Sequence, residues 1–378
     1  MHVNRKTQRA TNQLVLFLSI LLFIIYLNRP QSEDKSFSWT KIRYKTTSAR
    51  LPEARGKCPK LSGSKNPALV VSRVAADGDP AWLNKLTDHY HLCVYGVDSP
   101  ADKTSTFLQV PANRGHEAMA YLTFIIDNYA DIPAAGAVFV HGSRWAWHND
   151  APDYDNAALL TALDVPRALE LRGYYNLRCD WSTSTCPPTV AAQGSLEMRL
   201  QSTLEPWSAR AASDTALPRA LVSIFGGGDY TAMEQKAKLE LRRTDAVRSQ
   251  CCAQFVVSRE RVLQHSRLEY VALRQWLLDG MEDPRSSQTH GGQAAPLDDR
   301  VAGRILSYLW HILFAKPNAS GELELRQLNQ DACPNAADCY CRLYGRCDLQ
   351  CPNPGICWGQ YKIPPDYKLP SDWAATHS

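Results

Sequence analysis

Apolar residues are concentrated near the N-terminus in one almost unbroken run, Leu14–Leu27. Three basic residues precede this run, and a segment of mixed charge follows it. Because positive charge stays on the cytoplasmic side of a membrane, we expect a type II single-pass protein. It would have a cytoplasmic tail over residues 1–13, a transmembrane signal anchor over 14–28, and the remainder in the Golgi or ER lumen. The run is shorter than the ~20 residues of a full span, so a cleaved leader that releases a secreted protein is the alternative.

Beyond the stem, short apolar runs alternate with amphipathic stretches. Ala68–Arg73, His91–Gly96 and Ala137–Val140 are typical of buried strands. Between the second and third of them, apolar residues from Met119 to Tyr129 recur with helical spacing. Alternation of this kind predicts an α/β fold with a mostly parallel central sheet flanked by helices. Ligands of such sheets bind beyond the carboxyl ends of the strands.

The same pattern divides the chain into segments. Residues 29–66 are polar and lack periodicity, which predicts a flexible stem. Residues 67–330 are expected to form the lumenal α/β domain, with a loop-rich insertion near 185–247 and a long helix over Asp299–Phe314. Residues 331–378 form a cysteine-rich C-terminal segment.

Composition excludes one large class of partner. The 378 residues are 44% hydrophobic and 21% charged, which is ordinary for a globular protein, and the formal net charge is only +4. No dense run of Lys and Arg with interleaved aromatic residues occurs. We therefore expect no nucleic-acid partner.

Twelve cysteines agree with an oxidising compartment. Six of them lie in the last fifth of the chain, at spacings that suit disulfides better than zinc. Neighbouring cysteines rarely bond to each other, so Cys251 and Cys252 are expected to pair elsewhere, with Cys179 and Cys186 as candidates, or to remain buried thiols. Asn318-Ala319-Ser320 is a sequon for N-glycosylation.

The segment with the most reactive side chains follows the third strand. Its members carry imidazole, guanidinium or carboxylate groups: His141, Arg144, His148, Asp150, Asp153 and Asp155. Asp153 and Asp155 form an Asp-x-Asp pattern, which can hold Mn²⁺ or Mg²⁺ against a diphosphate. The alternative is that Pro152 and Asp153 form a turn and cap a helix that begins near Asn156.

Two arginines occupy positions suited to anions. Arg73 ends the first strand, and Arg114 precedes the N-terminus of the amphipathic helix. Together with His141 and Arg144 they are candidate substrate-binding residues, although a solvated or ion-paired role would leave the same pattern. His116-Glu117 does not continue as a zinc-protease helix, because Ala120 stands where the second histidine is required.

Several longer motifs resemble those of the domain-of-unknown-function family 3431, found mainly in fungi. The resemblance runs over roughly Leu69 to Cys347 and is carried by LVVSR, NRGHEAMAYLTFIIDNY, FVHG with WHNDAPDYDN, GYYNLRCDW, CCAQFVVSRERV and YLWHILF. Members of that family generally look like type II membrane or secreted proteins. Two segments depart from the usual family pattern: Arg73-Val74-Ala75-Ala76-Asp77 replaces Arg-Tyr-Asn-Glu-Asp, and Gly115-His116-Glu117 replaces Gly-Arg-Glu.

The resemblance also has functional implications. The opening strand–helix–strand and the QFVVSRE segment are similar to those of GT-A glycosyltransferases, which have a Rossmann-like fold. By that similarity, Asp153 and Asp155 would bind the metal or the diphosphate, and Asp150 or Glu260 would be the catalytic base.

We therefore expect a single-pass, lumenal, GT-A-like protein that transfers or recognises sugar, with a nucleotide sugar and a glycan as partners and Mn²⁺ or Mg²⁺ as cofactor. A non-catalytic carbohydrate-binding or scaffold protein is the second hypothesis. The third is a metal-dependent hydrolase that uses His141, His148 and Asp150.

Overall fold

The computed structural model describes most of the chain. Its described residues are 5–28, 35–45, 55–100, 102, 104–227, 237–281 and 293–361. Residues 29–34 and 46–54 of the predicted stem and residues 362–378 of the C-terminal segment lie outside them.

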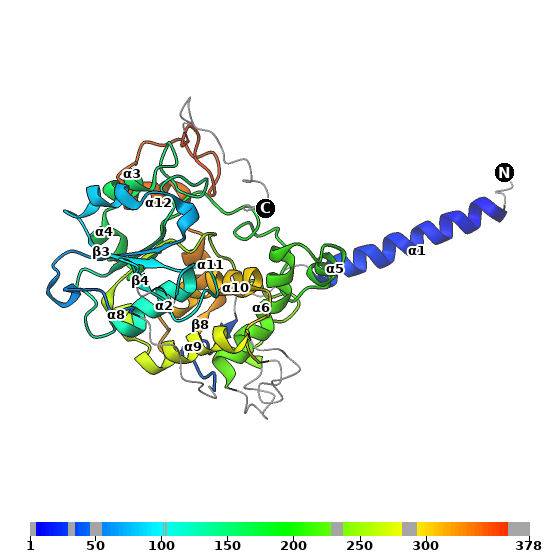
Figure 1. Ribbon diagram of the computed structural model, residues 1–378. Coiled ribbons are helices and arrows are strands. Elements are labelled where there is room, and N and C mark those ends of the chain that lie inside the picture. Colours follow the sequence, from blue (N-terminus) through cyan, green and yellow to red (C-terminus); the bar gives the residue numbers. More distant parts are fainter. Residues whose placement is uncertain are drawn as a thin grey trace.

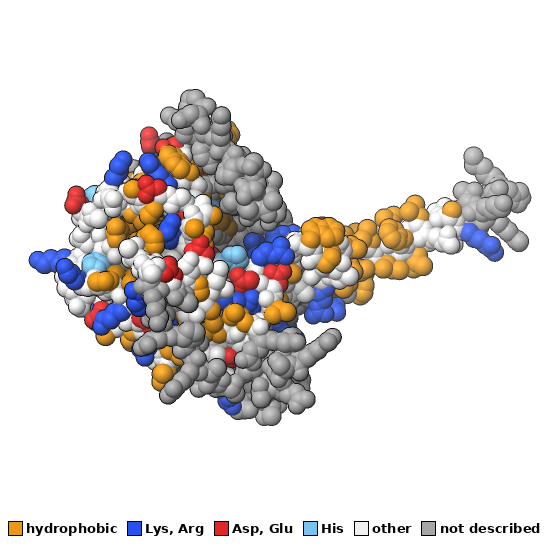
Figure 2. All heavy atoms as spheres, viewed as in Figure 1, with side chains coloured by type: hydrophobic (Ala, Val, Ile, Leu, Met, Phe, Trp, Pro, Cys, Tyr) orange, Lys and Arg blue, Asp and Glu red, His pale blue; other side chains and the backbone are white. Residues whose placement is uncertain are grey.

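The N-terminal apolar run forms helix α1 (Arg5–Asn28), which projects from the body of the protein (Figure 1). Within it, Gln8–Tyr26 is long and apolar enough to cross a membrane, and none of that stretch is buried against the protein. Apolar side chains cover much of its length (Figure 2). A signal anchor and a signal sequence both have these properties.

The body is built on a six-stranded sheet with the order β4-β3-β2-β5-β7-β6. Its strands are β2 (Ala68–Arg73), β3 (His91–Gly96), β4 (Leu108–Gln109), β5 (Ala137–His141), β6 (Tyr174–Asn176) and β7 (Phe255–Val257). Strand β2 is parallel to both of its neighbours, β3 and β5, whereas β7 is antiparallel to β5 and β6. The predicted α/β fold with a mostly parallel sheet is therefore confirmed.

Helices cover both faces of this sheet (Figure 1). Val70, Phe139 and Phe255 face one core and Val71, Val140 and Val256 face the other, as the twofold alternation of side chains along strands requires. The first core is closed by α2 (Glu117–Asp127), α6 (Ala209–Gly226), α9 (Arg267–Asp279) and α10 (Asp299–Leu313). The second is closed by the 3₁₀ helix η3 (Pro80–Leu86) and by α3 (Asn156–Ala162), α4 (Val165–Leu169) and α12 (Ala336–Tyr344).

The expected loop-rich insertion is largely helical. It contains α5 (Leu196–Leu204) and the 18-residue α6, which packs on α10. Small residues of α6 allow this close packing, and Ser213 Oγ donates to the carbonyl of Val301 over 3.4 Å. The prediction was wrong here because alanines and serines on a helix produce almost no hydrophobic stripe.

Part of the expected flexible stem is folded onto the domain. Strand β1 (Ser36–Phe37) pairs with β8 (Leu323–Glu324), next to helix α11 (Leu325–Ala332). The rings of Phe37 and Trp39 stack 4.0 Å apart and are fully buried. Two isolated aromatic residues in a polar stretch thus anchor the segment, because their burial outweighs the polarity of its other residues.

All twelve cysteines form disulfides, as expected for an oxidising compartment. The pairs are Cys58–Cys93, Cys179–Cys339, Cys186–Cys333, Cys251–Cys252, Cys341–Cys347 and Cys351–Cys357. The expectation for the adjacent cysteines was wrong, since Cys251 and Cys252 bond to each other. Cys179 and Cys186 instead tie the C-terminal segment to the α/β domain.

Candidate functional site

The carboxyl ends of β2 and β5 meet at a point where the order of the strands reverses. From β2 the chain continues to β3 and β4 on one side and then crosses to β5 on the other. Ser72 pairs with His141 in this register, so Arg73 and His141 lie at the same edge of the sheet. Open α/β sheets bind their ligands at such a switch point, because the loops diverge there and leave a crevice.

Asp77 lies in the loop after β2, at the end of the short 3₁₀ helix η2 (Ala75–Asp77). Its carboxylate accepts a hydrogen bond from the Val74 backbone N–H over 2.8 Å. Burial raises the pKa of Asp77 above its ordinary value, and the Val74 amide and the nearby His141 and Arg73 offset that rise only in part. A partly buried carboxyl group with a raised pKa beside a crevice is typical of a functional site.

Gly142 brings the loop after β5 against this carboxylate. A Cβ at position 142 would lie 2.6 Å from Oδ2 of Asp77 and would also collide with Arg73. Only glycine permits such a close approach. The loops that follow β2 and β5 therefore touch directly behind the crevice.

A cavity of about 470 Å³ opens between these two loops. Asp77, Asp79 and Lys85 contribute from the β2 side, and Ser143, Arg144 and Trp145 from the β5 side. Trp145 is 37% exposed, and the Arg144 guanidinium lies 4.7 Å from its ring centroid. The wall thus combines an aromatic surface with charges of both signs.

Arg73 and His141 lie at the same edge of the sheet but are not part of the cavity lining. The Arg73 guanidinium lies over the Phe107 ring at 4.5 Å and donates to the Gly78 carbonyl over 3.0 Å. His141 Nε2 lies 4.0 Å from a carboxylate oxygen of Glu117, which belongs to the first turn of α2. Of the predicted residues, Arg144 therefore lines the crevice, while Arg73 and His141 lie beside it at the ends of β2 and β5.

Asp153 and Asp155 are both engaged in local contacts within the protein. Both oxygens of Asp155 accept from Arg144, over 3.0 and 2.7 Å, and Oδ1 also accepts from the Ala157 N–H at the start of α3. Asp153 accepts from the Asp155 N–H over 3.2 Å. Among the described residues, Cys58, His91 and Cys93 alone form a group with metal-ligand spacing, and a disulfide joins its two cysteines. A helix cap is present at this place, as the alternative expected, but the capping residue is Asp155 and not Asp153.

Asp150 is the centre of a buried polar network and does not reach the crevice. It is 1% exposed, and its carboxylate accepts from the Tyr361 hydroxyl over 2.7 Å, from the Tyr340 hydroxyl over 3.2 Å and from the Cys179 N–H. Although the rings of His141 and His148 lie 4.9 Å apart, Asp150 is turned toward the C-terminal segment. The arrangement supports neither the predicted base nor the His141–His148–Asp150 metal site.

Glu260 lies at the opposite edge of the sheet from the crevice. It is exposed in α8 (Arg259–Leu263), which follows β7. Because β7 is antiparallel to β5, its C-terminal residue Val257 pairs with Ala137, the first residue of β5. The prediction of Glu260 rested on the similarity to GT-A glycosyltransferases, and the antiparallel direction of β7 places this residue away from the crevice.

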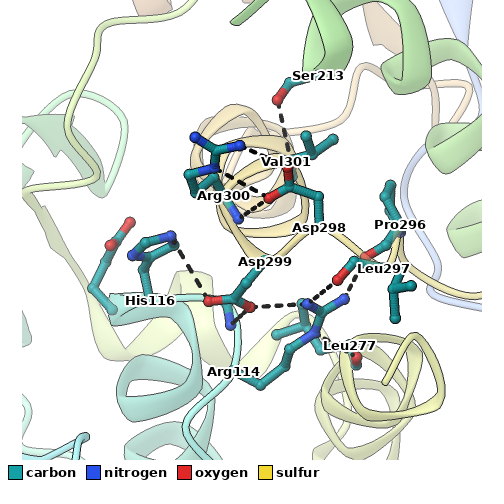
Figure 3. A network of polar contacts seen from close by, with 12 residues as sticks. Arg114, His116, Ser213, Leu277, Pro296, Leu297, Asp298, Asp299, Arg300 and Val301 are labelled. Atoms are coloured by element: carbon teal, nitrogen blue, oxygen red, sulfur yellow. Dashed lines mark hydrogen bonds and ion pairs between the residues drawn. The ribbon is translucent and has the colours of Figure 1, made fainter. Parts of the chain in front are cut away.

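Arg114 is a buried structural residue and not an anion ligand. It is 4% exposed, and it donates to Asp299 over 3.1 Å and to the carbonyls of Leu297 over 2.8 Å and Leu277 over 3.3 Å, as Figure 3 shows. The carbonyls of Gly280 and Pro296 also accept from it. Its guanidinium thus joins α9 and α10 to the loop that precedes α2.

The sequence interpretation missed Asp77 and Trp145. One signal for Asp77 was available. It matches the last residue of the Arg-Tyr-Asn-Glu-Asp family segment, whereas Val74, Ala75 and Ala76 differ from that segment. For Trp145 no signal distinguished an exposed tryptophan from a buried one. Its exposure depends on the turn that Arg144 and Asp155 hold together.

Comparisons with other proteins identify a family without an assigned activity. No curated protein and no solved structure matches the chain. A family model matches residues 69–342, well over half of the chain, and its range includes β2 through α10, the crevice and its loops. The chain therefore belongs to the family described as protein of unknown function (DUF3431).

Proposed function

We propose that this domain recognises sugar in the crevice between β2 and β5, as a glycosyltransferase-like protein of the secretory pathway held in the membrane by α1. The observation that carries the proposal is the position of Asp77, with a raised pKa, at the switch point of the sheet beside Trp145. The apolar face of a sugar ring packs on exposed aromatic rings, while its hydroxyls need charged or polar partners. The cavity offers both.

Transfer would use the charges that surround this cavity. In such a reaction the acceptor hydroxyl oxygen bonds to the sugar carbon, the bond from that carbon to the diphosphate breaks, and a base removes the hydroxyl proton. Asp77 is suited to be the base, because burial shifts its pKa upward, toward the pH at which the reaction would take place. Arg73 and Lys85 would stabilise the departing diphosphate. The proposal needs no role for Asp153 and Asp155.

Sugar recognition without transfer is the second candidate. The contacts of Asp155 with Arg144 and α3 favour it, because they leave the Asp-x-Asp pair without a free face for a diphosphate-bound cation. In this case the crevice would hold a glycan, and Asp77 would accept hydrogen bonds from its hydroxyls.

The test separates the two candidates. The full chain in detergent is incubated with UDP-glucose, UDP-galactose, UDP-N-acetylglucosamine and GDP-mannose, with Mn²⁺ and with EDTA, and released nucleotide and thermal shifts are measured. Transferase activity predicts nucleotide release that Asp77→Asn abolishes and that Asp88→Asn, at an exposed residue outside the crevice, does not. Glycan-array binding that Trp145→Ala removes, without nucleotide release, favours recognition alone. If the protein neither released nucleotide nor bound a glycan, the proposal would be refuted.

A further inference from the structure

A second cavity lies at the opposite edge of the sheet, far from the crevice. It has a volume of about 320 Å³ and lies beside Tyr174, the first residue of β6. Tyr174 pairs with Val257, which in turn pairs with the first residue of β5, whereas the crevice lies beyond the last residue of that strand. The two cavities are therefore independent sites.

The inner wall of this cavity is apolar and holds one polar atom without a partner. Tyr174 and Phe314 have ring centroids 5.7 Å apart, and Leu171 and Leu328 extend the apolar surface. His311 also contributes to the lining and is 6% exposed, and its Nε2 has no hydrogen-bond partner among the described residues. Burial lowers the pKa of His311 to about 3, so its ring is neutral at physiological pH.

Charges at the mouth of the cavity balance one another. Arg172 forms an ion pair with Asp331 at 2.9 Å, and Gln327 donates to the same carboxylate over 2.6 Å. Lys316 and Glu324 add one charge of each sign. A balanced rim over an aromatic wall suits an uncharged ligand with hydroxyl or amide groups and does not suit a nucleotide or a phosphate.

Asn318 lies in the wall of this cavity as the acceptor of a sequon. Its amide nitrogen Nδ2 donates to Glu324 Oε1, another lining residue, over 3.2 Å. Its Oδ1 accepts from the Ser320 hydroxyl over 2.7 Å and from the Ser320 N–H over 3.1 Å. The side chain is thus oriented so that its nitrogen, the atom that carries an N-linked glycan, lies along the cavity.

We propose that Asn318 is N-glycosylated and that the first N-acetylglucosamine of the glycan occupies this cavity. The sugar arrives on a lipid-linked diphosphate: Asn318 Nδ2 bonds to its C1, the bond from C1 to the diphosphate oxygen breaks, the diphosphate leaves with the electron pair, and one amide proton is lost. The remaining N–H of Nδ2 can still donate to Glu324.

The size and chemistry of the cavity fit one sugar ring. Small-molecule pockets span about 300–1,000 Å³, and this cavity is near the lower limit. The C–H face of the ring and the acetyl methyl group would pack on Phe314 and Leu328, and its hydroxyls would face the charged groups at the mouth. The glycan beyond the first sugar would extend into solvent past Lys316.

Two enzymes test this on the full chain produced in eukaryotic cells that make high-mannose glycans. Endoglycosidase cleaves between the first two sugars, whereas peptide N-glycosidase must reach the bond at Asn318. We expect endoglycosidase to trim the native protein, and peptide N-glycosidase to act about tenfold or more slowly on native than on unfolded protein. Because Asn318 is in the sequence's one sequon, every mass change by these enzymes reports on this residue.

Matched variants complete the test. Ser320→Ala removes the sequon and should abolish the mass shift, whereas Ser320→Thr retains it. The protein trimmed to a single sugar should melt at the temperature of the untreated protein, and Ser320→Ala should melt lower. A wild-type protein without glycan would overturn the proposal. Removal of the glycan at equal rates from native and unfolded protein would overturn the placement of the sugar in the cavity.

Discussion

Arg144 holds Asp155 with two parallel hydrogen bonds, Nε to Oδ1 at 3.0 Å and Nη2 to Oδ2 at 2.7 Å. The same carboxylate caps α3 through the Ala157 N–H at 2.9 Å. One side chain thus fixes both ends of the loop that presents Trp145 to the crevice. A bidentate pair restrains geometry as well as adding free energy, so the loop conformation depends on it.

Two substitutions at Asp155 separate the contribution of its ion pair with Arg144 from that of its cap on α3. Asp155→Asn keeps a good helix cap and loses the charge, so we expect it to lower the free energy of unfolding by about 1–2 kcal/mol. Asp155→Ala loses both and should cost about 2–4 kcal/mol. Urea denaturation monitored by circular dichroism measures the difference.

Asp153→Asn is the matched control, because Asp153 makes only a local contact with the Asp155 N–H. It should change stability by less than about 0.5 kcal/mol. If Mn²⁺ raised the melting temperature of the wild-type protein but not of Asp153→Asn, that result would support the metal site predicted from the sequence.

Gly142→Ala should damage the crevice more than the fold. The new Cβ would collide with the Asp77 carboxylate and with Arg73, so the loops after β2 and β5 must separate. We expect loss of sugar binding with a destabilisation of about 1–3 kcal/mol. Gly63→Ala is the control, because a Cβ there meets nothing within 4 Å. Wild-type ligand affinity in Gly142→Ala would contradict the placement of the site.

Arg114→Lys tests a structural role against a ligand-binding role. Lysine retains the charge but cannot satisfy the carbonyls of Leu277, Leu297 and Gly280 together with Asp299. We expect a loss of about 2–4 kcal/mol in the free energy of unfolding. Arg300→Lys, at an exposed ion pair with Asp298, should have no measurable effect. Native stability of Arg114→Lys with weaker anion binding would reverse the assignment.

The sequence was sufficient for the features that depend on local periodicity. Strands β2 and β3 begin and end where the short apolar runs predicted, because consecutive apolar residues between polar ones define a buried strand. Arg73 and His141 could be placed at the site because parallel strands end at one edge. Strands β4 and β6, of two and three residues, are too short to produce such a signal.

Features that depend on tertiary partners could not be predicted. Packing between distant segments decides whether β7 runs parallel or antiparallel to β5. Because β7 is antiparallel, Glu260 lies beside the start of β5 and away from the crevice. Asp150 and Arg114 were interpreted as accessible because nothing local indicates that Tyr340 or the carbonyl of Leu297 would come to lie beside them. Charged residues in loops therefore gave the least reliable site predictions.

Asp180 makes stability depend on pH in a defined direction. Burial, and secondarily the charge of Asp150, raise its pKa from 3.8 to about 6, although Tyr340 and Arg178 partly oppose this. Between these values the native state binds a proton that the unfolded state does not. The contribution of Asp180 to stability is thus complete at low pH and is lost as the pH rises toward about 6 and beyond.

Asp180→Asn removes this dependence. Relative to wild type, the variant should gain stability between pH 4 and pH 7 by up to about 3 kcal/mol, the equivalent of the pKa shift. Urea denaturation at several pH values measures the difference, with the exposed Asp98→Asn as control. A difference between variant and wild type that does not change with pH would show that Asp180 titrates normally.

The disulfides of the C-terminal segment should differ in their effect on stability according to the loop that each one closes. Cys179–Cys339 spans 160 residues, whereas Cys351–Cys357 spans six. A cross-link stabilises by limiting the unfolded chain. Because Cys186–Cys333 stays in place, the additional loop that Cys179–Cys339 closes has only about 13 residues, and the chain-entropy relation assigns about 3 kcal/mol to it and about 2 kcal/mol to the loop of Cys351–Cys357.

The double variants Cys179→Ala/Cys339→Ala and Cys351→Ala/Cys357→Ala test this difference by thermal denaturation under non-reducing conditions. The first should lose more stability, and it should also weaken the contact of Tyr340 with Asp150, because Cys186–Cys333 then ties only the start of the segment to the domain. Limited proteolysis would detect that release as early cleavage after residue 331. Equal losses in the two variants would show that the segment is held by its buried side chains and not by the bond to Cys179.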